Sequence, residues 1–348
     1  MECGIVGFPG VGKTTLFEAL TAHSVKIQPG TLNANLGQAD IPDPRLHEIA
    51  RHITTQEIIP ARIHLVDIPG IPRGSGSGYA AVLANIRNVD ALCHVVDCFS
   101  EEANPVSALA DLELELILAD LALVESALEK AHKAAGSGDK EAAARRDALE
   151  KTQAVLESER PVRSAEWSDE EVAALRGYGL LSSKPQLVVA NINESDLDGS
   201  GVVLADLRAA VADAGGVLVA LSANLESEIA ELPAEERDEM LRSMGLVEPA
   251  IGPLARAINE LLGLATFYTA GEKEVRAWPI RQGAAAPEAA GVIHTDIEHG
   301  FIRAECYHVD ELSELGSEKA IKEAGKLRSE GKQYVMQDGD VVHFLFNV

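Results

Sequence analysis

The sequence predicts an α/β protein in which a doubly wound, mostly parallel sheet carries an inserted helical hairpin and a small C-terminal α+β domain. Short apolar runs alternate with helical patterns as far as Leu264, and one long helical stretch interrupts this alternation. After Leu264 the pattern changes to strand-like alternation. Strands separated by helices form βαβ units, and these units build parallel sheets.

Five apolar runs predict the strands of the parallel sheet. They are Cys3–Gly7, Arg62–Asp67, Ala91–Cys98, Gln186–Asn191 and Val217–Ser222. Helical spacing predicts a helix from Lys13 to about His23. The segment Ser24–Gly37 is polar and irregular, so we expect a loop there.

The helical insertion and the C-terminal region set the expected domains. Leu109–His132 and Asp139–Ser158 have helical patterns on either side of a glycine turn, which predicts an antiparallel hairpin. TFYTAGEKEVRAWPI and DGDVVHFLFNV read as strands of a separate module. The expected domains are 1–104 with 180–264 for the sheet, 105–179 for the hairpin and 265–348 for the C-terminal module.

Composition narrows the function. The chain carries 55 acidic and 30 basic residues, a net charge of −25, so we expect no binding to free DNA. No apolar run reaches the about 18 residues of a membrane span. The four cysteines show neither zinc-site spacing nor a disulfide framework, which favours reduced thiols and a cytoplasmic location.

Residues 7–14 read GFPGVGKT and match the phosphate-binding pattern G-x-x-x-x-G-K-[ST] between a strand and a helix. Glycines let backbone N–H groups surround phosphates at a helix N-terminus. Lys13 is expected to reach the β- and γ-phosphates and act in catalysis, and the Thr14 hydroxyl to bind Mg²⁺. The expected nucleotide contacts of this loop are Gly10, Val11, Gly12, Lys13, Thr14 and Thr15. The protein is therefore expected to be a P-loop NTPase.

Further motifs follow in the order of a GTPase-type domain, whereas metabolic P-loop kinases share only the first. Asp67 and Gly70 form D-x-x-G; Asp67 is expected to hold Mg²⁺ through water, and the Gly70 N–H to contact the γ-phosphate. Thr31, in the preceding loop, is a candidate Mg²⁺ ligand. Ser222 and Ala223 end the last strand, where a base-contacting pair is expected.

The base-reading motif departs from the guanine pattern Asn-Lys-x-Asp. Asn191 is present, but Ile192 replaces the lysine and Glu194, one methylene longer, replaces the aspartate. A misplaced carboxylate weakens guanine discrimination by about 1–3 kcal/mol. Relaxed or adenine preference is the hypothesis that follows.

These motifs and several longer stretches resemble the YchF/Obg-like ATPase family, within the Obg-related GTPases, over nearly the whole chain. The stretches include IPDPRL (41–46), ANINE (190–194), SANLESEIAEL (222–232), AGEKEVRAW (270–278) and QDGDVVHFLFNV (337–348). The resemblance implies binding and hydrolysis of ATP, with GTP as a poorer ligand, association with ribosomes, a coiled-coil arm and a C-terminal TGS-type domain.

The chain also departs from that family. Gly10 stands where the family P-loop usually has an asparagine suited to potassium, so potassium activation is not expected. The glycine-rich segment after Gly70 is shorter, and the family's proposed catalytic histidine segment has no counterpart in SEEANP (100–105). Ile71 follows Gly70 where many GTPases place a water-orienting glutamine, and His94 is more typical of a core histidine. We therefore expect slow hydrolysis.

Three functions remain open from the sequence. The leading one is a slow ATPase switch that docks on ribosomes or translation factors. The second is a nucleotide-gated scaffold with negligible hydrolysis. A GTP-preferring GTPase is a further alternative. The third function is a P-loop phosphotransferase, and the D-x-x-G motif argues against it. Seven basic residues of the C-terminal module are candidate contacts to a ribosome, although ordinary solvated surface charges are the favoured explanation for them. They are Lys273, Arg276, Arg281, Lys319, Lys322, Lys326 and Arg328.

Overall fold

The computed structural model describes residues 1–27, 33–72, 78–135, 139–197 and 199–347. These residues form two compact units. One comprises Met1–Gly37 and His64–Ile251, and the other comprises Gln38–Ile63 and Gly252–Val348. The chain passes from the first unit to the second within β2 (Asn35–Ile41) and returns within β4 (Ala61–Asp67). It enters the second unit again at Gly252. None of the helices in the described ranges combines the length and apolar composition that a bilayer crossing requires.

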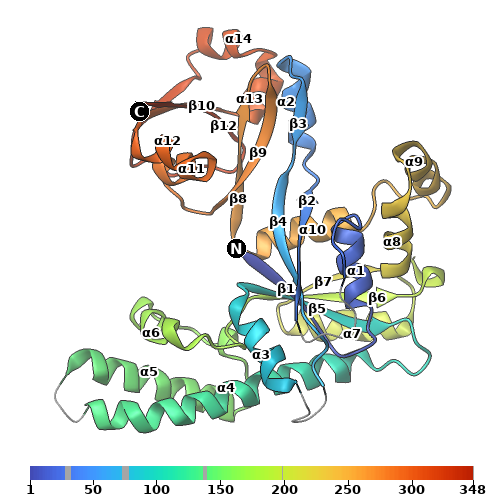
Figure 1. The fold of residues 1–348 in the computed structure, drawn as a ribbon, viewed down its shortest axis with the longest axis vertical. Coiled ribbons are helices and arrows are strands. Elements are labelled where there is room, and N and C mark those ends of the chain that lie inside the picture. Colours follow the sequence, from blue (N-terminus) through green and yellow to red (C-terminus); the bar gives the residue numbers. More distant parts are fainter. Residues whose placement is uncertain (28–32, 73–77, 136–138, 198, 348) are drawn as a thin grey trace. The chain divides into compact units, whose positions relative to one another are not determined.

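The first unit is built on a six-stranded sheet of order β2-β4-β1-β5-β6-β7 (Figure 1). Its strands are β1 (Glu2–Val6), β2 (Asn35–Ile41), β4 (Ala61–Asp67), β5 (Ala91–Cys98), β6 (Gln186–Ile192) and β7 (Val217–Leu221). The β4–β1, β1–β5, β5–β6 and β6–β7 pairs are all parallel. The carboxyl ends of these parallel strands therefore meet at one edge, where α/β proteins place ligands.

Helices lie between these strands and after the last of them. They are α1 (Lys13–Leu20), α3 (Tyr79–Asn88), α7 (Val202–Asp213), α8 (Ala223–Glu231) and α9 (Ala234–Ser243), with the short 3-10 turn η3 (Glu194–Asp196). The strands are apolar on both faces: Ile5, Val95 and Val189 are fully buried. Burial on both faces is typical of a parallel sheet covered by helices.

A helical arm follows β5. Its long helices are α4 (Pro105–Ala135) and α5 (Lys140–Glu157), which pack against each other, and η1 (Val162–Ser164), α6 (Asp169–Leu175) and η2 (Arg176–Tyr178) follow. Val124 and Leu149 belong to their common core. Asp120 of α4 is fully buried and accepts hydrogen bonds from the backbone N–H groups of Leu181 and Ser182, both at 2.8 Å. This carboxylate fixes the chain that returns from the arm to β6.

The second unit is a mixed six-stranded sheet of order β11-β10-β12-β8-β9-β3. Its strands are β3 (Glu57–Ile59), β8 (Leu264–Ala270), β9 (Glu274–Arg281), β10 (Phe301–His308), β11 (Arg328–Glu330) and β12 (Asp340–Phe346). Its helices are α2 (Pro44–His52), α10 (Ile251–Leu261), α11 (Ala286–Ile293), α12 (Thr295–His299), α13 (Val309–Leu315) and α14 (Glu318–Glu323). The core contains Phe267 and Phe344, whose rings meet edge to face at 5.8 Å.

Residues 38–63 belong to this second unit because β3 pairs with β9 and polar contacts hold α2. Asp43 caps α2 by accepting from the Arg45 N–H at 3.0 Å, and it also accepts from the Tyr268 hydroxyl. Arg45 donates in turn to Asp338 at 2.6 Å. Tyr268 is fully buried, so the start of α2 is tied to the C-terminal sheet.

The predicted elements are confirmed with two corrections. The expected loop Ser24–Gly37 is wrong at its end, since β2 begins at Asn35 and adds an edge strand to the sheet. The expected helix to His23 ends at Leu20. The two compact units also differ from the expected domain limits, since Gln38–Ile63 groups with the C-terminal residues and the second unit begins at Gly252.

Candidate functional site: a P-loop at the carboxyl edge of the parallel sheet

The P-loop connects the end of β1 to the start of α1. Gly7 has φ 150° and lies so close to β5 that a Cβ there would be 2.5 Å from the Val95 carbonyl oxygen. Gly12 has φ 90°, and a Cβ there would collide with the Asn191 side chain. Both positions require glycine, because other residues rarely adopt these angles and a side chain has no room.

Lys13 opens α1 and is 7% exposed. Its Nζ donates to the Phe8 carbonyl oxygen at 2.7 Å, so the ammonium lies within the loop. Burial lowers the pKa of Lys13 to about 8, although the negative charge of Asp67 opposes the shift. A buried ammonium with one hydrogen bond is well placed to bind an anion such as phosphate.

Thr14, Asp67 and Asn35 converge at one carboxylate oxygen. The Thr14 hydroxyl and the Asn35 side-chain amide each donate to Asp67 Oδ2 at 3.0 Å. Burial raises the pKa of Asp67, while these two bonds and the charge of Lys13 lower it. A hydroxyl and a carboxylate are the hard oxygen ligands that Mg²⁺ takes in P-loop proteins, so the residues fit that ion.

The predicted third magnesium ligand, Thr31, lies outside the described residues. Among those described, no group of three or more His, Cys, Asp or Glu side chains could hold a metal ion. A magnesium ion at Thr14 would therefore need oxygens from nucleotide phosphate and water, as is usual for Mg²⁺ in nucleotide-binding sites.

The D-x-x-G turn lies directly against the P-loop. A Cβ at Gly70 would be 2.7 Å from the Pro9 backbone nitrogen. The next residue, Ile71, is fully buried and donates its N–H to the Gly7 carbonyl oxygen at 3.2 Å. Only glycine allows this approach at position 70, which brings its backbone beside the phosphate loop.

Asn191 joins three of the predicted motifs. Its Nδ2 donates to the Val11 carbonyl oxygen at 3.0 Å, and its Oδ1 accepts from the Ala223 N–H at 2.9 Å. Asn191 is 6% exposed, and Ser222 caps α8 by accepting from the Leu225 N–H. The asparagine thus holds the P-loop and the Ser222–Ala223 pair together, through hydrogen bonds that burial makes costly to lose.

The two altered positions of the base motif lie in different surroundings. The Ile192 side chain is 3% exposed and belongs to an apolar cluster with Val96, Val188 and Leu204. Glu194 is exposed and begins η3, which Asn193 caps through the Ser195 N–H. Ile192 therefore contributes to the core, whereas the Glu194 carboxylate is accessible to solvent.

The other predicted contacts of the phosphate loop surround Lys13. Gly10 is exposed with φ 85°, and Thr15 is half-buried on the first turn of α1. Val11 is buried and offers its carbonyl oxygen to Asn191. Hydrogen bonds thus link Thr14 with Asp67, and Asn191 with Val11 and Ala223. In the described part of the chain, Glu194 makes no side-chain hydrogen bond or ion pair with the other motifs.

Sequence reasoning missed two side chains of this region. Asn35 stood in a segment expected to be a loop, and only its strand position brings it to Asp67. Glu226 of α8 is 2% exposed and accepts from the N–H groups of Ala250 and Ile251. An acidic residue at an otherwise apolar helical position was the available signal for Glu226.

His94 is a core histidine, as the sequence favoured. It is 1% exposed in β5, and its Nδ1 lies 3.0 Å from the Gln186 side-chain amide. Burial, together with the charges of Arg163 and Lys13, lowers the pKa of His94 to about 3. The ring is therefore neutral and enclosed, which does not suit it to orient a water molecule.

Known proteins resemble this chain along its whole length. The family model described as "50S ribosome-binding GTPase" matches residues 2–126, and YchF-GTPase_C, described as "Protein of unknown function", matches residues 264–347. The chain is 42% identical to "Ribosome-binding ATPase YchF" of Bacillus subtilis over 364 aligned residues, covering 100% of both chains. The protein of that name from Escherichia coli O157:H7 is also 42% identical, covering 100% of this chain and 99% of its own.

A solved structure agrees with these sequence matches. The Schizosaccharomyces pombe YchF GTPase superposes with a TM-score of 0.88 at 30% identity, covering 99% of this chain and 97% of that one. Full-length identity, the P-loop constellation and this common architecture lead to one conclusion: the chain belongs to the YchF family of P-loop proteins.

Proposed function

We propose that the protein is a nucleotide-dependent switch that binds ATP with Mg²⁺, hydrolyses it slowly and associates with ribosomes. The observation that carries the proposal is the convergence of Lys13, Thr14 and Asp67 at one end of the P-loop. Relatives of 42% identity are named ribosome-binding ATPases, and the fission yeast relative is named a GTPase. All these names describe a nucleotide hydrolase, but they differ on whether the nucleotide is ATP or GTP.

In this proposal the chain positions phosphate groups and stabilises their charge. Lys13 exchanges the Phe8 carbonyl oxygen for the β- and γ-phosphates, and the N–H groups of residues 10–15 surround them. Thr14 and, through water, Asp67 would hold Mg²⁺, whose charge neutralises the phosphate oxygens. The Gly70 N–H contacts the γ-phosphate, so loss of that phosphate releases the D-x-x-G turn.

The surroundings of the base motif support ATP as the preferred ligand. Ile192 is packed in the core, so no lysine stem covers the base at this position. Glu194 is exposed and longer than the aspartate that accepts two hydrogen bonds from guanine. Discrimination in favour of guanine is therefore expected to be weak. Because the Glu194 carboxylate is exposed to solvent, binding adenine would not leave a buried carboxylate without a hydrogen-bond partner.

We expect slow hydrolysis, because two described residues that were candidates to orient the attacking water are unsuited to that role. Ile71 is fully buried and apolar, and the His94 ring is neutral and enclosed. Neither can orient the attacking water, which is the role of glutamine in many GTPases. The same observation favours a second candidate, a nucleotide-gated scaffold that binds ATP and barely hydrolyses it.

The proposed setting is the cytoplasm, with ribosomes or translation factors as partners. Four of the seven candidate basic contacts in the C-terminal module lie close to carboxylates of the same unit. Arg276, Lys319, Lys326 and Arg328 lie within 4.0 Å of Glu274, Glu323, Glu314 and Asp340, respectively. These carboxylates offset the positive charge that the unit could present to RNA, and we propose that the ribosome contact involves protein.

Single-turnover hydrolysis of ATP, with and without purified ribosomes, tests the proposal. We expect slow cleavage that ribosomes accelerate and that Lys13→Ala abolishes. A rate that Lys13→Ala leaves unchanged would show that the activity belongs to a contaminant. Tight ATP binding without cleavage under either condition would establish the scaffold instead.

A further inference from the structure

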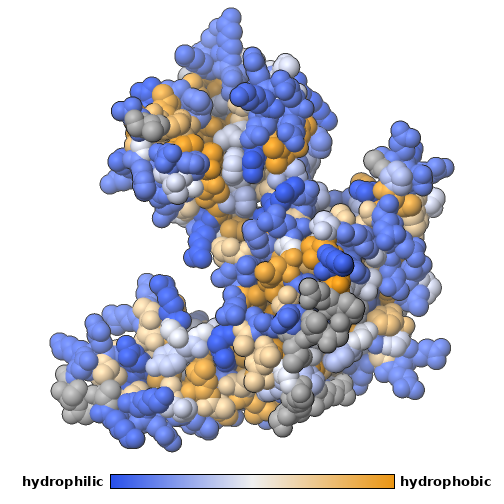
Figure 2. All heavy atoms as spheres, viewed as in Figure 1, coloured by the Kyte–Doolittle hydropathy of each residue, from blue (hydrophilic) through white to orange (hydrophobic). Residues whose placement is uncertain are grey.

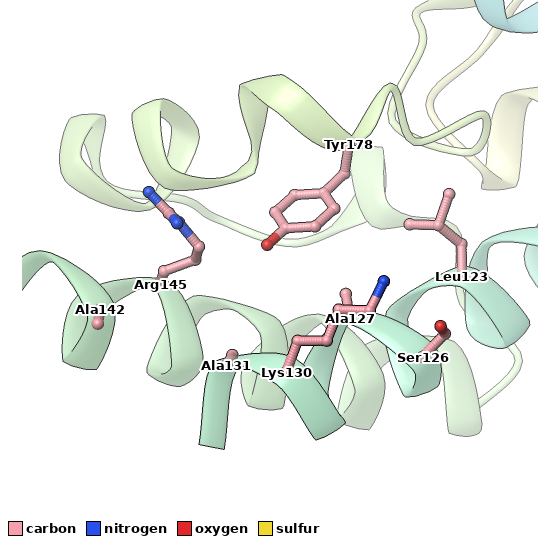
Figure 3. A pocket seen from close by; sticks show the side chains of 8 residues that line it. All are labelled: Leu123, Ser126, Ala127, Lys130, Ala131, Ala142, Arg145 and Tyr178. Atoms are coloured by element: carbon pink, nitrogen blue, oxygen red, sulfur yellow. The ribbon is translucent and has the colours of Figure 1, made fainter. Parts of the chain in front are cut away.

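The helical arm carries a hollow that the nucleotide site does not use. It lies between α4, α5 and η2 and has a volume of about 580 Å³. This size falls in the usual range for ligand sites, about 300–1,000 Å³. Its lining residues are Leu123, Ser126, Ala127, Lys130, Ala131, Ala142, Arg145 and Tyr178 (Figure 3).

The floor of the hollow is apolar and made of small side chains. Ala131 and Ala142 are 7% and 8% exposed and come from the facing helices α4 and α5. Leu123 and Ala127 pack against the same arm core. Figure 2 shows apolar atoms among hydrophilic ones on the visible face of the arm. Alanines leave space between the helices that an apolar side chain can fill.

Tyr178 forms one wall and is held by the turn behind it. Figure 3 shows its ring entering the hollow from η2, with the hydroxyl directed into the open space. Gly179 follows with φ 58°, and its carbonyl oxygen accepts from Arg87 Nε at 3.2 Å. Within the described chain the Tyr178 hydroxyl has no hydrogen-bond partner. A half-buried aromatic ring that combines an apolar face with a polar hydroxyl is typical of interface residues.

Two cations on the rim lack carboxylate partners. Lys130 and Arg145 are exposed, and no Asp or Glu of the described residues lies within salt-bridge distance of either. Three other cations of the arm are paired, Arg146 with Asp147, Lys151 with Glu171 and Arg163 with Glu113, and none of these three lines the hollow. The hollow therefore presents two free positive charges beside an apolar floor.

The charge of the arm decides between a nucleic acid and a protein as occupant. Residues 105–179 contain nine Lys and Arg and sixteen Asp and Glu, a net charge of −7. A polyanionic backbone following this surface would meet repulsion on either side of the two cations. A short segment with one or two carboxylates meets only the cations, while its apolar side chain fills the hollow.

We propose that this hollow binds a protein segment that presents an apolar side chain next to a carboxylate. Resting on the proposed function, we assign this segment to a protein component of the ribosome. The carboxylate pairs with Lys130 and Arg145, and the apolar side chain lies against Tyr178 and the alanines. The arm is then a contact to ribosomal protein and not to ribosomal RNA.

Cosedimentation of the full chain with purified ribosomes tests this proposal. Lys130→Glu combined with Arg145→Glu is expected to weaken binding about tenfold or more, because two charge-assisted contacts become repulsive. Ala127→Trp, which fills the hollow without changing charge, is expected to weaken it similarly. The matched control, Lys133→Glu with Lys140→Glu, makes the same charge change on the same helices outside the hollow and is expected to bind normally. Unchanged ATP affinity in each variant verifies that it is folded.

A photoreactive benzophenone side chain at Ser126 identifies the occupant. We expect an adduct with purified ribosomes that resists ribonuclease, is destroyed by protease and is lost in the charge-reversal pair. An adduct that ribonuclease removes would overturn the proposal in favour of RNA. Normal ribosome binding by both hollow variants would overturn the proposal and leave the proposed function intact. Absence of ribosome binding by the unaltered protein would overturn both.

Discussion

Asn35 donates its side-chain amide to Asp67 Oδ2 at 3.0 Å, the oxygen that also accepts from Thr14. Asn35 is the first residue of β2, which runs from the nucleotide-binding unit into the C-terminal one. The D-x-x-G aspartate is thus oriented by the strand that leads to the second unit. We expect a change at Asp67 on loss of a γ-phosphate to reach the start of β2 through this hydrogen bond.

Asn35→Ala is expected to weaken Mg·ATP binding about fivefold to tenfold, the usual effect of losing one partly exposed hydrogen bond to a charged group. The affinity should fall most at low Mg²⁺ concentration, because Asp67 loses its orientation. Fluorescent ATP titrations across a range of Mg²⁺ concentrations measure this effect. Asn33→Ala, an exposed asparagine of the same segment, is the control and should bind normally. Equal behaviour of the two variants would remove Asn35 from the site.

The lowered pKa of Lys13 predicts a pH dependence of binding. Its folded-state pKa is about 8, against an ordinary value of about 10.4. Above pH 8 the empty site loses its ammonium, so apparent ATP affinity should fall by up to about tenfold per pH unit as far as pH 10. In Lys13→Arg the guanidinium stays charged, and its binding should be independent of pH over this range. A flat profile for the unaltered protein would contradict the buried-ammonium description.

The same shift affects stability in the opposite direction. Between about pH 8 and 10.4 the unfolded chain binds more protons at Lys13 than the folded chain. The contribution of Lys13 to the free energy of unfolding therefore rises with pH across this window. Comparing urea unfolding of the unaltered protein and Lys13→Met at pH 7.5 and 9.5 isolates that contribution.

Asn191→Ala should destabilise the fold as well as the site. It leaves the Val11 carbonyl oxygen and the Ala223 N–H without their buried partner, at a cost of about 2–4 kcal/mol in the free energy of unfolding. Asn193→Ala, two residues further on and exposed, removes only the cap of η3 and should cost about 1 kcal/mol or less. Chemical denaturation of both variants checks the difference. Equal losses would mean that the bridge between motifs is weak.

Gly10→Asn is expected to confer activation by potassium. By the resemblance described above, the family P-loop usually has asparagine there, and nothing lies within 4 Å of a Cβ at Gly10. The φ of 85° is a conformation that asparagine tolerates better than most residues. ATP hydrolysis in potassium and in sodium buffers, for both proteins, is the measurement. Potassium activation of the unaltered protein would contradict the expectation drawn from Gly10.

Much of the local geometry of the candidate site follows from the sequence, because its residues occur in contiguous motifs with local causes. Gly12 and Gly70 are fixed by backbone angle and close approach, and Asn191 by its place at a strand end. Asn35 was not predictable, since its strand is an edge strand whose pairing arises from tertiary contacts and not from its polar, glycine-containing sequence. The grouping of residues 38–63 with the C-terminal sheet likewise depends on long-range contacts such as Asp43 with Tyr268.

The altered base motif is proposed to prefer adenine. Titration of the nucleotide-free protein with fluorescent ATP and GTP analogues, in Mg²⁺ at one salt concentration, tests it most directly. We expect tighter binding of ATP, because Ile192 lies in the core and the exposed Glu194 is one methylene longer than the aspartate that reads guanine. Clearly tighter binding of GTP would show that Asn191 and Glu194 read guanine, and would rule out the proposed adenine preference.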